Sequence, residues 1–70
     1  MQKLNYNNLK HLQQFAKALI LIKYQLIIPT KDIILLEAGC DKYGDINYLY
    51  FRIGDVYYDY RNKSLKMILK

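Results

Sequence analysis

Catalytic chemistry in this chain would have to come from very few side chains. His11 is the only histidine and Cys40 the only cysteine, and the two lie far apart in the sequence. Structural metal sites need several such ligands at short spacings. Neither Thr30 nor Ser64 has a base partner in the sequence that would make it a nucleophile. We therefore predict no catalytic residue, no cofactor and no metal, and a protein that is not an enzyme.

The residue types that stand out instead are tyrosine and arginine, gathered in the C-terminal third. At the period of a β-strand they fall on one face between positions 48 and 61. Tyr and Arg dominate the binding energy of protein interfaces, and aromatic side chains also stack on single-stranded bases. Aromatic residues equally favour strands for packing reasons alone. The candidate partner-binding residues are Tyr48, Tyr50, Arg52, Tyr57 and Arg61.

A protein is the partner that this face fits best. Sheets that stack on bases usually add a positive rim, and Asp59 lies in the middle of the face. Nucleic acid is the alternative ligand, and a homodimer is compatible with so short a chain. The most apolar run, 18–28, is too short and too polar to span a bilayer, so we expect no membrane partner.

Three strands joined by two tight turns are expected to position these residues. Gly54-Asp55 and Asn62-Lys63 are the turn candidates. In the register that they set, Asp59 falls opposite Lys66, a favourable cross-strand pair. The same register places the apolar residues on the opposite face of the sheet, namely Leu49, Phe51, Ile53, Val56, Tyr58, Tyr60, Leu65, Met67 and Leu69.

Residues 8–22 predict an amphipathic helix that covers the apolar face of the sheet. Apolar residues recur at the spacing of one helical face, with lysines and glutamines on the other side. The run 19–22 is apolar on all sides, so we expect that end of the helix to be buried. The apolar stripe consists of Leu9, Leu12, Phe15, Ala16, Leu19 and Ile22.

The middle of the chain, residues 24–40, fits two structures. Segments 24–28 and 33–36 could form another hairpin around Pro29, with the second segment buried on both faces. Alternatively, Thr30 caps a short helix that Gly39 ends. The segment 41–45 is a turn in both cases.

The helical alternative leads to a different fold. Residues 30–40 are similar to the second helix and tight turn of helix-turn-helix proteins. That resemblance would make 46–53 a recognition helix and 56–69 the wing of a winged helix. The sequence departs from this pattern in 46–53, which is rich in β-favouring residues and has Arg52 as its one cation.

The favoured fold class is α+β, in a single domain spanning residues 1–70. An N-terminal amphipathic helix packs on an antiparallel sheet that ends in a three-stranded β-meander, and a winged helix-turn-helix is the alternative fold. The lone cysteine suits a reducing compartment, so we expect a cytoplasmic protein.

The expected function is non-enzymatic binding. The abundance of Lys, Asn, Ile and Tyr indicates an AT-rich genome, which is common among phages and mobile elements. We expect an inhibitor or accessory factor that docks on a protein, such as a nucleic-acid-processing enzyme. The alternative is a small DNA- or RNA-binding regulator of the winged-helix type.

Overall fold

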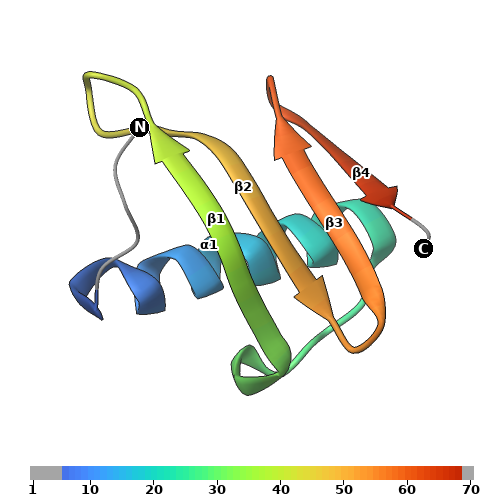
Figure 1. Ribbon diagram of the computed structural model, residues 1–70. Helices are drawn as coiled ribbons and strands as arrows, with labels where there is room; N and C mark the ends of the chain where they lie inside the picture. Colours follow the sequence, from blue (N-terminus) through green and yellow to red (C-terminus); the bar gives the residue numbers. More distant parts are fainter. Residues whose placement is uncertain (1–5, 69–70) are drawn as a thin grey trace.

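The computed structural model describes residues 6–68, in which one helix packs across one face of a four-stranded antiparallel sheet (Figure 1). The strands follow the chain in order, β1-β2-β3-β4. The predicted α+β class and the helix-on-sheet arrangement are confirmed. The elements are α1 (Tyr6–Tyr24), the 3-10 turn η1 (Thr30–Asp32), β1 (Ile33–Cys40), β2 (Ile46–Ile53), β3 (Val56–Arg61) and β4 (Ser64–Ile68).

The register predicted for the meander is confirmed. Ile53 lies opposite Val56, and Tyr58 lies opposite both Phe51 and Met67. Gly54 has a φ of 59°, which glycine adopts at little cost. Asn62 and Lys63 have φ values of 55° and 61°, the left-handed conformation that the second tight turn requires. Leu69, assigned to the same face, lies outside the described residues.

The core forms where α1 crosses the sheet. Leu12, Ala16 and Ile20 bring one side of the helix against the strands, and all three are buried. The ring of Phe51 stacks on that of Tyr58 at 5.3 Å between centroids. The buried residues contributed by the sheet are Ile33, Ala38, Leu49, Phe51, Tyr58 and Leu65.

The C-terminal end of α1 differs from the prediction. Ile20 is fully buried, but Ile22, assigned to the apolar stripe, is 78% exposed and Leu21 is 46% exposed. The expectation that the whole end is buried was wrong, because only one side of the last turn faces the sheet. Lys23 lies on that side, and its ammonium donates a hydrogen bond to the backbone carbonyl of Leu65.

Neither structure proposed for the middle segment is found in full. Residues 33–40 form strand β1, as the hairpin predicts, but 24–28 forms no strand. Burial on both faces was also wrong, since Ile33 is buried while Ile34 and Leu36 are each 40% exposed. The segment 41–45 is a turn, in which Asp41 Oδ1 accepts hydrogen bonds from the backbone N–H groups of Tyr43 and Asp45.

The winged-helix alternative is wrong for this chain. It required helices at 30–40 and 46–53, and both stretches consist mainly of β-strand. The β-branched and aromatic residues of 46–53 pair on both sides within the sheet, where such side chains pack well.

Candidate functional site: the open face of the sheet

One face of the sheet has no helix packed on it among residues 6–68, and it is turned toward the viewer in Figure 1. Successive side chains of a strand point to opposite faces of the sheet, so every second residue of each strand lies on this face. All five predicted binding residues fall there together, as the register of β2 and β3 requires. We call this surface the open face, and its central residues are Glu37, Tyr48, Tyr50, Arg52, Tyr57, Asp59, Arg61 and Lys66.

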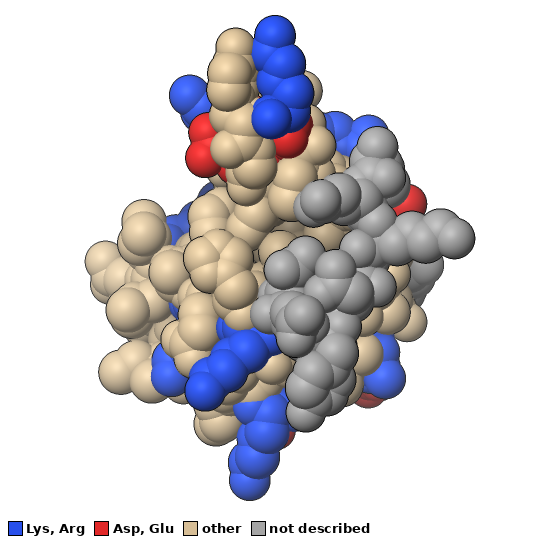
Figure 2. Space-filling view, turned by 90° about the vertical axis from the view of Figure 1, so that its left-hand side faces the viewer, with Lys and Arg blue, Asp and Glu red and all other residues tan. Residues whose placement is uncertain are grey.

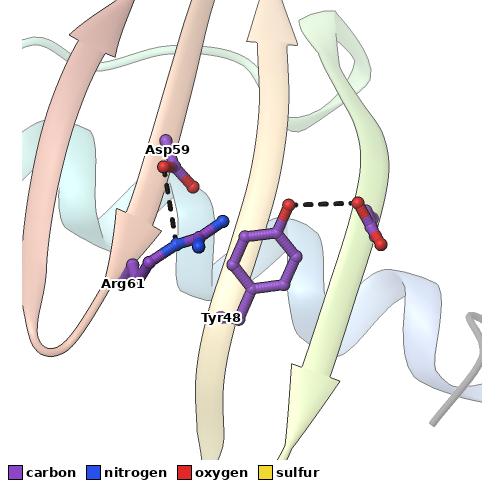
Figure 3. Close-up of polar contacts among 4 residues, drawn as sticks. Tyr48, Asp59 and Arg61 are labelled. Carbon is purple, nitrogen blue, oxygen red and sulfur yellow. Dashed lines mark hydrogen bonds and ion pairs between the residues drawn. The ribbon is translucent and has the colours of Figure 1, made fainter. Parts of the chain in front are cut away.

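A cluster around Tyr48 spans three strands of the open face (Figure 3). The Tyr48 hydroxyl donates a hydrogen bond to Glu37 Oε2 on β1 at 3.0 Å. The guanidinium of Arg61 on β3 lies over the Tyr48 ring, 4.5 Å from its centroid. A cation above an aromatic face is attracted by the ring quadrupole. The ring of Tyr48 is therefore held at its edge and on one face before any partner arrives.

Asp59 joins the cluster from the same strand as Arg61. Its Oδ2 lies 3.7 Å from Arg61 Nε, in an ion pair in which the Arg61 side chain is 60% exposed and the Asp59 side chain 23% exposed. Such a pair contributes little to stability by itself. Lys66 lies opposite on β4, in the predicted register, but the ion pair of this carboxylate is with Arg61. The other oxygen, Oδ1, is buried and has no hydrogen-bond partner among residues 6–68.

A pair of stacked tyrosines lies beside the Tyr48 cluster. Tyr50 and Tyr57 stack with ring centroids 6.0 Å apart and planes inclined by 29°. Arg52, the remaining predicted residue, donates from Nη1 to the carbonyl of Gly54 at 2.8 Å. Its guanidinium is thus turned toward the hairpin turn of its own strand, which reduces its availability to a partner.

Hollows border the Tyr48 cluster. One of about 530 Å³ is lined by residues of three strands and one turn, and smaller ones of about 230 and 250 Å³ lie beside it. The lining of the 530 Å³ hollow adds three residues that were not among the predicted binding residues, namely Glu37, Asn47 and Asn62. Glu37 joins the site only once β1 is known to be a strand.

The phenol of Tyr48 is a weaker acid than usual. Partial burial raises its pKa, and the hydrogen bond to Glu37 together with the carboxylates of Glu37 and Asp59 raises it further, against a smaller opposing effect of Arg61. Burial also raises the pKa of Tyr58, with an added contribution from Tyr24. Both groups remain neutral where ordinary tyrosines ionise.

These shifts predict a late phase in the alkaline titration of the eight tyrosines. Unfolded tyrosines ionise near pH 10, and a raised folded pKa means that folding favours the neutral phenol. The stability that the neutral forms of Tyr48 and Tyr58 contribute to the folded state is therefore fully present below about pH 10. It is lost as the pH rises through the folded pKa values of these two tyrosines. We expect phenolate absorbance to show the late phase, and Tyr48→Phe to remove part of it. If Tyr48→Phe instead lowered the amplitude of the main phase and left the late phase intact, the assigned environment of Tyr48 would be contradicted.

The side chains considered for chemistry are not brought together. His11 is exposed on α1, and Cys40 is half-buried at the end of β1 with a free thiol. In the described part of the chain, no group of three or more His, Cys, Asp or Glu side chains could hold a metal ion. No helix formed by residues 6–68 is long and apolar enough to cross a membrane.

Comparison with protein-family models, with curated proteins and with solved structures finds no match for this chain. The fold itself defines a small α+β protein with one helix on an open antiparallel sheet. Any functional argument therefore rests on the geometry of its surfaces.

Proposed function

We propose that this chain is a non-catalytic binding protein that docks on another protein through the open face of its sheet. The arrangement of Tyr48 carries the proposal. Its ring is fixed by the Glu37 hydrogen bond and by the Arg61 guanidinium. A side chain already held in place loses little conformational entropy on binding, so more of its contact energy appears as affinity. Stacking between Tyr50 and Tyr57 gives the adjacent area the same rigidity.

The charges of the open face favour a protein over nucleic acid. Arg52, Arg61 and Lys66 are interspersed with the carboxylates of Glu37 and Asp59. Nucleic-acid surfaces instead concentrate cations that neutralise phosphates. Figure 2 views the molecule from the neighbouring edge, on the β1 side, where basic and acidic side chains both appear with uncharged surface between them. Tyrosine and arginine, which supply five of the central residues of this face, are enriched in protein interfaces.

The unsatisfied oxygen of Asp59 suggests one specific contact. A buried acceptor without a partner costs free energy until a donor reaches it. A partner side chain with N–H or O–H groups, inserted beside Arg61, would supply that donor. We propose a role as an inhibitor or accessory factor acting in the cytoplasm, encoded by a phage or mobile element. The free thiol and the abundance of amino acids that have AT-rich codons, namely Lys, Asn, Ile and Tyr, support it.

Substitution of Tyr50 tests the proposal. We expect Tyr50→Ala to weaken the complex recovered with the natural partner by about 2 kcal/mol or more, because interface tyrosines are frequent hot spots. Tyr43→Ala is the matched control, since Tyr43 is 78% exposed in the turn between β1 and β2. Affinities measured by calorimetry, with circular dichroism to verify folding, provide the comparison.

Salt dependence separates the two kinds of ligand. Affinity from buried aromatic area should change little with ionic strength. Each neutralised DNA phosphate would instead add about 0.9 to the log–log slope against salt. If the slope is steep and Tyr50→Ala leaves it unaltered, the ligand of the open face is nucleic acid and not a protein. Equal losses for Tyr50→Ala and Tyr43→Ala would show that the open face is not the interface.

A further inference from the structure

A second surface lies on the helix side of the molecule, away from the open face. Four large aliphatic side chains are exposed where α1 ends and the chain continues. Ile22 and Ile27 are each 78% exposed. Large aliphatic side chains exposed within a few residues of one another are a feature of interaction sites in soluble proteins when they form one patch. We call it the aliphatic patch, and its residues are Leu21, Ile22, Leu26 and Ile27.

The end of α1 generates the aliphatic patch. Gln25 adopts a left-handed conformation with φ of 58°, and its N–H donates to the Leu21 carbonyl at 2.9 Å. This αL turn ends the helix and redirects the chain, so Leu26 and Ile27 follow directly after the last helical turn. Tyr24 packs inward on Tyr58 instead.

The outer side of α1 extends the patch toward the N-terminus. Ala18 is exposed, and it precedes Leu21 by three residues and Ile22 by four. Residues at these spacings share one side of a helix. A small side chain at this point lets the axis of a second helix approach closely, because interaxial distance depends on the side chains at the contact. The outer side is therefore shaped to pack against another helix.

The net charge of the protein is concentrated in the same part of the chain. Residues 1–31 contain five lysines and no acidic residue, whereas residues 32–70 contain six basic and six acidic residues. The whole net charge of +5 thus belongs to the segment that holds α1. Lys17 lies one turn before Leu21 on the same side of the helix. A ligand for the patch should be apolar at its centre and acidic at its borders.

We propose that the aliphatic patch binds an amphipathic helix of a second protein, whose apolar stripe is bordered by Asp or Glu. The helix packs along the outer side of α1 over Ala18, and its carboxylates face Lys17, one turn before Leu21. Because α1 and the open face lie on opposite sides of the sheet (Figure 1), this interface is independent of the proposed one. The protein can then join two partners.

Two other occupants fit less well. A second copy would bring together two helices that carry lysines and no acids, which repel one another. Membrane-surface helices insert Trp, Tyr or Phe at the interface. The aliphatic patch contains none, and the aromatic residues of α1 nearest to it, Phe15 and Tyr24, pack on Tyr60 and Tyr58.

The test uses two synthetic helical peptides of roughly 18 residues, about five turns. Both carry one stripe of Leu and Ala, bordered by Glu in one peptide and by Lys in the other. We expect the full-length protein to bind the Glu peptide and not the Lys peptide in fluorescence anisotropy. The double variant Ile22→Gln, Ile27→Gln should bind it at least tenfold more weakly. The control Ile34→Gln removes an exposed aliphatic side chain of β1 and should bind as the parent does.

Four results would overturn this proposal. They are equal binding of both peptides, undiminished binding by the double variant, and concentration-dependent dimerisation that the double variant abolishes. The fourth is binding to phosphatidylserine–phosphatidylcholine vesicles that the double variant loses. Tyr50→Ala should bind the Glu peptide normally, so failure of the open-face interface and failure of this one are separately visible.

Discussion

Replacing Phe51 by alanine is expected to remove most of the stability of the protein. The Phe51 side chain is fully buried in β2, and its ring stacks on Tyr58 beneath α1. Removing a buried phenylalanine costs about 3–5 kcal/mol through lost transfer free energy and the cavity left behind. The total stability of a small domain is only about 5 kcal/mol. With about 0–2 kcal/mol of stability left, the variant should unfold at a far lower urea concentration than the parent and be as much as half unfolded at 25 °C without denaturant.

Urea denaturation followed by circular dichroism measures this effect. Tyr43→Ala is the control, because it removes an aromatic ring that is 78% exposed and should change stability by at most about 0.5 kcal/mol. If Phe51→Ala showed the same unfolding midpoint as the parent, Phe51 could not lie in the core, and the assignment of the two sheet faces would be inverted.

The meander was predictable because local signals agree with one another. A strand period of two, interrupted by turn residues at two places, leaves one register in which every apolar residue shares a face. A slip by one residue would move Phe51 and Tyr58 to the surface together. Two turns thus fix three strands, and the membership of the open face follows from the same register.

The partners of the open-face residues were not predictable in the same way. The bond from Tyr48 to Glu37 depends on β1, whose register shifts between Leu35 and Glu37. A bulge places an extra residue on one strand, so counting along the sequence assigns the wrong neighbour. The apolar run at the start of β1 also lacks alternation, so both a strand and a helix remained open for it.

The rotation of α1 at its C-terminal end could not be read from the sequence. Residues 19–22 are four consecutive apolar residues, so the helical spacing is compatible with more than one choice of which of them face the core. The structure selects Ile20 for the core and leaves Ile22 exposed. The helix begins and ends close to the predicted bounds, yet the side it buries in the last turn is decided by contact with the sheet.

A matched pair of substitutions tests that rotation. Ile20→Ala should destabilise the protein by about 2–5 kcal/mol, because Ile20 is fully buried and its removal leaves a cavity between α1 and the sheet. Ile22→Ala removes the same atoms two residues away, where the side chain is 78% exposed, and should change stability by no more than about 0.5 kcal/mol. Helix propensity cannot account for the difference, since both variants exchange isoleucine for alanine within the same helix. Urea midpoints of the two variants and the parent give the comparison. Equal losses would mean that both sides of the last turn are covered, and the aliphatic patch would then be closed to any partner.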